Sequence, residues 1–176
     1  YYLPDAETFK NKILIDPNRT ILGADQERWL DTQLQISKQR GTPWQILGQQ
    51  VLMGKLGLPV LTDEELKVEE TKPAYRPILQ MMQTLAKEEL PFNLDAWNGY
   101  PICRDTVFKS LAEHGVNPVV LAGDTHNAWA FNLADNNGQA IGVEIGTPGV
   151  NSRGIEAYLA TEPAVIGRAM QAASSE

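Results

Sequence analysis

The sequence predicts an α/β fold in which helices flank a mixed β-sheet, and three observations support this class. Apolar residues recur at helical spacing in several segments, and short apolar runs bounded by turn residues lie between them, as strands do. The stretch Asp-Asn-Asn-Gly at 135–138 is typical of a β-hairpin, so the two runs that it joins should pair antiparallel. With 176 residues, 43% of them hydrophobic, the chain can form a domain with its own core, and we assign residues 1–176 to a single domain or to most of one.

The elements can be assigned in order along the chain. Residues 1–22 are rich in turn signals, and 13–15 is at best a short strand. An acidic start followed by an apolar stripe with Trp29 and Leu34 predicts the first long helix. The continuous apolar run at 119–122 is typical of a strand buried on both faces. We expect a helix at 26–40, a strand at 44–48, helices at 78–85 and 102–114, strands at 119–122, 128–133 and 140–145, and a helix at 163–173.

Charge and composition exclude several kinds of partner. The chain has 15 basic and 22 acidic side chains, a net charge of -7, and its basic residues are scattered, so we expect no nucleic-acid patch. No apolar stretch approaches the roughly 18 to 20 residues of a membrane span. Cys103 is the single cysteine, which excludes an internal disulfide and favours a buried apolar role. The start at Tyr1 lacks Met and any signal pattern, so we expect a chain that is processed or cut from something longer.

The candidate site is the stretch Gly-Asp-Thr-His at 123–126, directly after a predicted buried strand. In open α/β sheets ligands bind at the carboxyl ends of strands. If the segment stays extended, Asp124 and His126 lie on the same side, and a carboxylate with an imidazole suits a metal ion. Asn127 adds an amide beside them. A plain strand-end turn, in which Asp124 accepts backbone hydrogen bonds, remains open, because a metal site needs three or more protein ligands.

Other polar residues point less clearly to chemistry. His114 is placed at a helix C-terminus, where a structural role is expected. Gln49 and Gln50 follow a strand and either reach the site or make structural hydrogen bonds. We expect the four tryptophans to be packing anchors, and these are Trp29, Trp44, Trp97 and Trp129. No serine stands in a nucleophile-elbow context, and no glycine-rich phosphate loop is present.

Five stretches, in order along the chain, resemble the C-terminal half of the alkaline phosphatase D (PhoD-like) family of metallophosphoesterases. They are LGADQERWLDTQL (22–34), WQILGQQVLM (44–53), WNGYPICRDTVFKSL (97–111), VVLAGDTHNAWAFNL (119–133) and VEIGTPGVNSRG (143–154). The resemblance implies a β-sandwich flanked by helices, with metal ions at the sheet edge. It also implies that an N-terminal half carrying the earlier metal motifs belongs to the same enzyme and is absent here.

The resemblance also implies roles for individual residues. Gly-Asp-Thr-His resembles the closing Gly-His-x-His metal motif of the wider superfamily, with Asp124 in place of the first histidine, which makes Asp124 and His126 metal ligands and catalytic residues. Asn127 and Arg153 are then candidates for binding the phosphate ester, since guanidinium groups bind phosphate bidentately. The expected metals are Ca²⁺ and Fe³⁺, and the expected location is periplasmic or secreted. The alternative is a non-catalytic structural or interaction domain that keeps the scaffold without a complete metal site.

Overall fold

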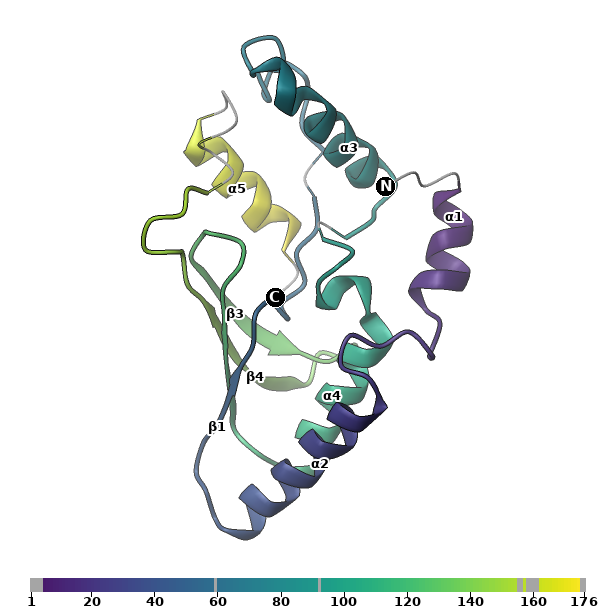
Figure 1. Ribbon diagram of the computed structural model, residues 1–176, viewed down its shortest axis with the longest axis vertical. Coiled ribbons are helices and arrows are strands. Elements are labelled where there is room, and N and C mark those ends of the chain that lie inside the picture. Colours follow the sequence, from purple (N-terminus) through teal and green to yellow (C-terminus); the bar gives the residue numbers. More distant parts are fainter. Residues whose placement is uncertain (1–4, 59, 92, 155–156, 158–161, 175–176) are drawn as a thin grey trace.

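The computed structural model describes residues 5–58, 60–91, 93–154, 157 and 162–174. Its helices are α1 (Ala6–Thr8), α2 (Ala24–Gln39), α3 (Arg76–Lys87), α4 (Pro101–His114) and α5 (Pro163–Ala173), and a π-helical segment, Phe9–Leu14, continues α1 (Figure 1). Its strands are β1 (Gln45–Gly48), β2 (Pro118–Ala122), β3 (Trp129–Ala134) and β4 (Ala140–Gly146). The predicted order of helices and strands from 26 onward is confirmed. The strand considered at 13–15 is wrong, because most of it continues the helix that begins at α1.

The four strands form one mixed sheet in the order β1-β2-β4-β3. Strand β2 pairs in parallel with both β1 and β4, while β3 pairs antiparallel with β4. The hairpin between β3 and β4 forms as predicted, since the carboxylate of Asp135 accepts the backbone N–H groups of Asn137 and Gln139, each at 2.8 Å. The predicted α/β class with a mixed sheet is therefore confirmed. The second sheet of a metallophosphoesterase-type sandwich remains an expectation, because the described residues contain this sheet only.

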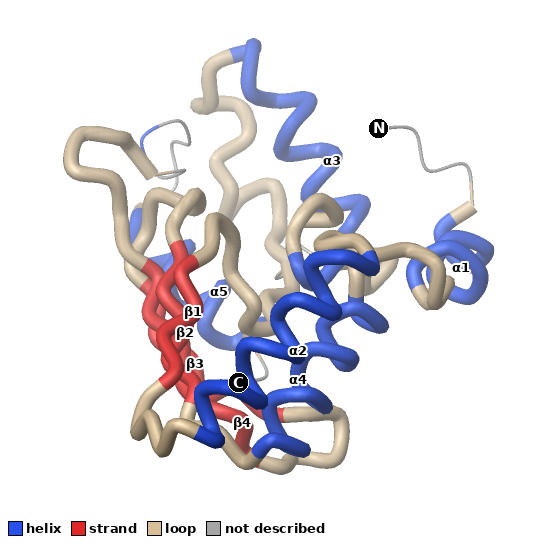
Figure 2. Tube along the Cα trace, turned by 60° about the horizontal axis from the view of Figure 1, so that its bottom comes forward, coloured by secondary structure: helices blue, strands red, loops and turns tan. Residues whose placement is uncertain are grey.

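Helices α2 and α4 pack together over one face of the sheet (Figure 2). Helix α4 ends at Gly115, whose φ of 57° is the left-handed conformation common after a helix. The core under these helices consists of Leu34, Leu52, Met53, Trp97, Cys103, Val107, Phe108, Leu111, Val120, Ala122, Phe131, Leu133 and Ile141. This packing fixes the sheet and the loops that leave its strands.

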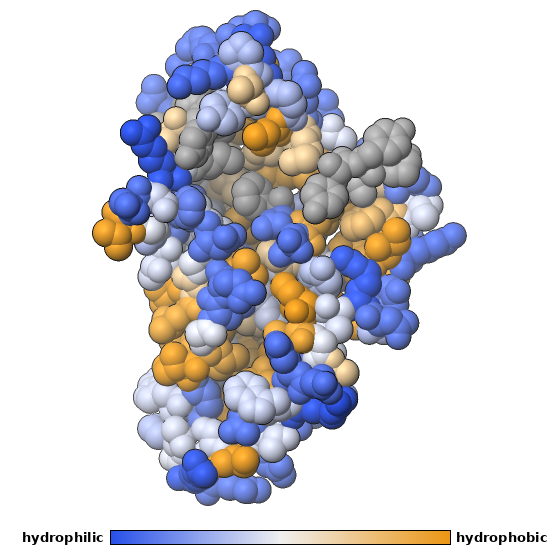
Figure 3. Space-filling view, viewed as in Figure 1, coloured by the Kyte–Doolittle hydropathy of each residue, from blue (hydrophilic) through white to orange (hydrophobic). Residues whose placement is uncertain are grey.

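The opposite face of the sheet is apolar and exposed. Side chains there belong to alternate residues of three strands: Ile46 is 60% exposed, Leu121 43%, Val143 41% and Ile145 42%. They are neighbours in the sheet, because Leu121 pairs with Ile145 across β2 and β4. Apolar side chains also gather over the strands in the surface view (Figure 3). The prediction that 119–122 is buried on both faces is thus wrong for this chain, in which Val120 is fully buried and Leu121 is not.

Two tryptophans also depart from expectation. Trp29 is 62% and Trp44 61% exposed, so neither anchors the core, whereas Trp97 is 4% exposed and does. Within the described residues, no helix has the length and hydrophobicity needed to cross a membrane.

Candidate metal centre

Three loops meet at the carboxyl edge of the parallel strands. They follow β1 (residues 49–54), β2 (123–127) and β4 (147–154). The N–H of Gly123 donates to the carbonyl of Gln50 at 3.2 Å, and the N–H of Thr147 donates to the carbonyl of Ala122 at 2.9 Å. The loop after β2 is therefore held between the other two, at the edge where open α/β sheets bind ligands.

The stretch 123–126 is a tight turn rather than an extended segment. The N–H of Thr125 donates to the carbonyl of Gly123 at 2.8 Å, which closes a three-residue γ-turn around Asp124. Asp124 has a φ of 67° and His126 a φ of 60°, both in the left-handed region. The predicted extended alternation is wrong for this reason, although both residues do lie in one turn. Left-handed backbone costs a residue with a side chain about 1–2 kcal/mol, and such strain is concentrated at functional sites.

The ring of His126 is oriented by the loop after β4. Its Nδ1 lies 3.1 Å from the carbonyl oxygen of Arg153. A carbonyl can only accept, so a hydrogen bond here requires the proton on Nδ1. The neutral imidazole then carries its lone pair on Nε2. Metal-binding histidines commonly have this arrangement, in which one ring nitrogen donates to a backbone carbonyl and the other binds the metal.

The carboxylate of Asp124 is exposed and, within the described part of the chain, receives no hydrogen bond. Other turn aspartates differ: the carboxylate of Asp16 accepts the N–H of Asn18 at 2.8 Å, and Asp135 behaves similarly. The interpretation of Asp124 as an acceptor of backbone hydrogen bonds is therefore not realised. Beside it, the hydroxyl of Thr125 is buried and has no hydrogen-bond partner among the described residues.

The donors at this turn fit a metal ion but do not complete its coordination. Asp124 offers carboxylate oxygens and His126 offers Nε2, and both side chains are exposed. Among the described residues, no group of three or more His, Cys, Asp or Glu side chains could hold a metal ion. This part of the chain therefore offers two candidate ligands, and a bound ion would need others.

The structure places the remaining predicted site residues at the same edge. Arg153 contacts His126 through its backbone carbonyl, and its side chain is exposed, so its role as a phosphate clamp stays a prediction. Asn127 is half-buried next to His126 in the same turn. Gln49 has a structural role, because its side-chain oxygen accepts the indole N–H of Trp97.

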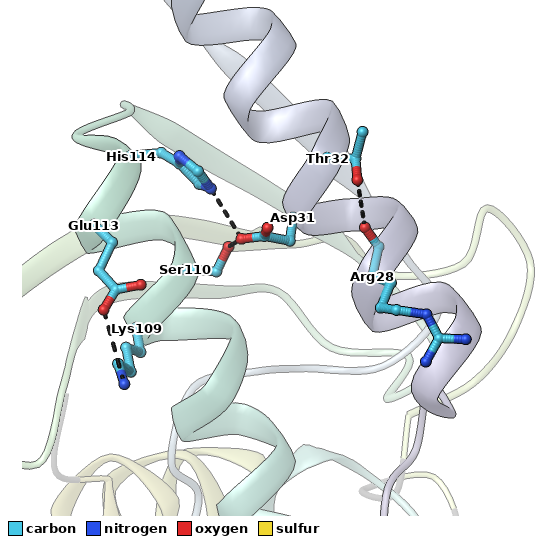
Figure 4. Close-up of polar contacts among 7 residues, drawn as sticks. All are labelled: Arg28, Asp31, Thr32, Lys109, Ser110, Glu113 and His114. Atoms are coloured by element: carbon cyan, nitrogen blue, oxygen red, sulfur yellow. Dashed lines mark hydrogen bonds and ion pairs between the residues drawn. The ribbon is translucent and has the colours of Figure 1, made fainter.

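A second polar cluster lies between α2 and α4 (Figure 4). Asp31 accepts hydrogen bonds from the hydroxyl of Ser110 at 2.6 Å and from Nε2 of His114 at 2.9 Å. These bonds, that of Ser110 first, hold the pKa of the Asp31 carboxyl below its usual value. A serine hydrolase needs the histidine between the serine and the aspartate, so this cluster is structural. The structural role predicted for His114 is confirmed.

The surroundings of Cys103 explain its role. It is 3% exposed, and its sulfur lies 3.2 Å from the carboxylate of Glu27. Burial raises the pKa of the thiol. Cys103 is therefore a buried, unreactive cysteine, as predicted.

Two buried charged residues beside the loop after β1 were not among the predicted site residues. Glu144 on β4 is fully buried, and Arg104 on α4 is 1% exposed. A glutamate within the apolar run Val-Glu-Ile of a strand is the one sequence signal that could have identified Glu144.

Comparison with known proteins agrees with the resemblance noted in the sequence. A family described as PhoD-like phosphatase matches residues 4–176. Alkaline phosphatase D of Bacillus subtilis (strain 168) is 31% identical over 119 residues, which cover 67% of this chain and 15% of that protein. No solved structure matches the chain. The match across almost its whole length shows that the chain belongs to the PhoD-like phosphatase family.

Proposed function

We propose that this chain contributes two metal ligands, Asp124 and His126, to the active site of a metal-dependent phosphoric ester hydrolase. Family membership supports the reaction class. The observation that carries the assignment of residues is the contact between Nδ1 of His126 and the carbonyl of Arg153, because it leaves Nε2 available to a metal. The carboxylate of Asp124 receives no hydrogen bond within the described residues and is held in a strained turn, which supports Asp124 as the second ligand.

Metal ions bound here would polarise phosphoryl oxygens and supply hydroxide as the nucleophile. The other residues of this chain have binding tasks. The exposed guanidinium of Arg153 would hold a phosphate oxygen through paired hydrogen bonds, while its carbonyl orients His126. Asn127 would place an amide beside the phosphate. Because the chain carries a net charge of -7, attraction of an anionic ester depends on the metals and on such local cations.

The proposal requires a partner, which is a further part of the same enzyme. The matched region is 15% of the length of the Bacillus subtilis relative, and the described residues supply two candidate ligands. The exposed apolar face of the sheet supports an additional layer, since parallel sheets are normally covered on both sides. As the resemblance implies, we assign Ca²⁺ and Fe³⁺ as the metals and a periplasmic or secreted location to the whole enzyme.

The test is metal content and hydrolysis in the enzyme carrying this chain, compared with His126→Ala and His114→Ala. His114 is the matched control, because it is the other histidine and bonds Asp31 instead. We expect His126→Ala to lose bound metal and the hydrolysis of p-nitrophenyl phosphate, while His114→Ala keeps both. Equal metal content in the two variants would contradict the proposal and favour a scaffold without chemistry. Parallel assays with bis(p-nitrophenyl) phosphate decide between monoester and diester substrates.

A further inference from the structure

A buried anion and a buried cation hold one residue of the loop after β1. The carboxylate of Glu144 accepts the N–H of Met53 and the N–H of Gly54, each at 2.8 Å. The Nε of Arg104 donates to the carbonyl of Met53 at 2.7 Å. Glu144 is fully buried and Arg104 is 1% exposed, so all three bonds lie away from water. The backbone of Met53 is thus fixed on both sides by charged groups from β4 and α4.

The same carboxylate reaches the start of this loop. The side-chain amide of Gln49 donates to Glu144 at 3.4 Å, and its oxygen accepts the indole N–H of Trp97. A Cβ at Gly54 would lie 2.4 Å from the ring of Phe131, so the loop is seated directly on the sheet. Residues 49–54 therefore cannot shift without breaking charge-assisted hydrogen bonds in the core.

This fixed loop supports the candidate metal turn. The carbonyl of Gln50 accepts the N–H of Gly123, the residue before Asp124. A small cavity of about 20 Å³ is lined by residues of both loops, among them Leu52, Asp124 and Thr125. The backbone around Asp124 is strained, so its conformation depends on neighbours that do not move.

We propose that Glu144 is a positioning residue for the metal site, acting through the loop 49–54 on the turn that carries Asp124. The inference rests on the function proposed above. Burying a carboxylate is costly unless it is fully compensated, and a purely packed core would not need one. Glu144 instead places two acceptor oxygens against two adjacent backbone N–H groups, which fixes the loop in one position.

The test compares Glu144→Gln with Leu111→Ala in the metal-depleted enzyme carrying this chain. The amide of glutamine keeps the shape but turns an N–H₂ group toward one of the backbone donors. Leu111 is the matched control because it is 1% exposed, lies on α4, and has no hydrogen bond to the loop, so its truncation destabilises the core alone. Mn²⁺ is titrated under conditions in which near-UV circular dichroism shows both variants folded. Binding is followed by paramagnetic broadening of NMR signals, and hydrogen exchange of the Gly123 amide is measured in parallel.

We expect Glu144→Gln to weaken Mn²⁺ binding about tenfold, as substitutions around metal ligands commonly do. It should also speed hydrogen exchange of the Gly123 amide. Leu111→Ala should leave the affinity unchanged. If the two variants have equal Mn²⁺ affinity while His126→Ala abolishes binding, the positioning role is overturned and the metal site stands. If His126→Ala leaves binding unchanged or the enzyme binds no Mn²⁺, the proposed function fails, and exchange at Gly123 decides the role of Glu144. Faster exchange in Glu144→Gln than in Leu111→Ala supports that role, and equal exchange overturns it.

Discussion

Glycine should be better tolerated than alanine at positions 124 and 126, the two strained positions of the turn that we propose binds metal. Asp124 and His126 have φ values of 67° and 60°, where any residue with a Cβ pays about 1–2 kcal/mol. Glycine avoids this cost but loses about 0.4–1 kcal/mol through the greater entropy of its unfolded chain. The difference leaves each glycine variant more stable than the matching alanine variant by about 1 kcal/mol, while both variants lose the proposed ligand.

The assay is thermal unfolding of the metal-free chain, in which about 1 kcal/mol corresponds to a shift of roughly 2–4 °C for a protein of this size. Two positions calibrate it. Glu89 has a φ of 54° and is exposed, so glycine should exceed alanine there by a similar margin without affecting metal. Gln33 lies within α2 and is exposed, so the order should reverse, because glycine disfavours helix. The reasoning is refuted if alanine equals or exceeds glycine at both 124 and 126 while these calibrating positions behave as stated.

Three further predictions concern other parts of the chain. Ser110→Ala should raise the pKa of Asp31 by removing its strongest hydrogen bond, which an NMR titration would detect. The folded pKa of Asp31 lies below its unfolded value. The difference in the free energy of unfolding between the unmodified protein and Ser110→Ala should therefore be present above about pH 4 and vanish as pH falls through the folded pKa. Cys103 should react with a thiol reagent only after denaturation, and rapid labelling of the native chain would contradict its burial. Val120→Thr should destabilise the isolated chain by about 1–3 kcal/mol, since it buries a hydroxyl, whereas Leu121→Thr on the open face should cost under about 0.5 kcal/mol in chemical denaturation.

The elements that the sequence predicts well are those whose signals are local. The stripe of α2 and the hairpin at Asp135 depend on residues within one or two turns of each other, and both form where expected. The sequence predicted the position of the turn at Asp124 correctly but its geometry wrongly. Extended alternation is a property of strands, and β2 ends at Ala122, after which the hydrogen bond from Thr125 to Gly123 reverses the backbone.

What the sequence did not reveal depends on contacts between distant segments. Glu144 is 91 residues from Met53, whose N–H it accepts, so no local pattern links them. The orientation of His126 likewise depends on Arg153, which is 27 residues away, and on a backbone atom rather than a side chain. Side-chain chemistry can be read from a sequence, but backbone carbonyls that orient a ligand cannot, because every residue has one.

The burial of strand β2 shows how one wrong expectation bears on the proposed function. An unbroken apolar run in a parallel strand normally means cover on both faces, and the described residues of this chain cover one. Ile46, Leu121, Val143 and Ile145 lie on the open face of the same strands whose carboxyl ends carry the metal turn. A layer packed on that face would end beside Asp124 and His126, where the proposed metal site needs further ligands. The exposed face and the incomplete ligand set therefore lead to one expectation, that a single additional part of the enzyme both buries the sheet and completes the metal site.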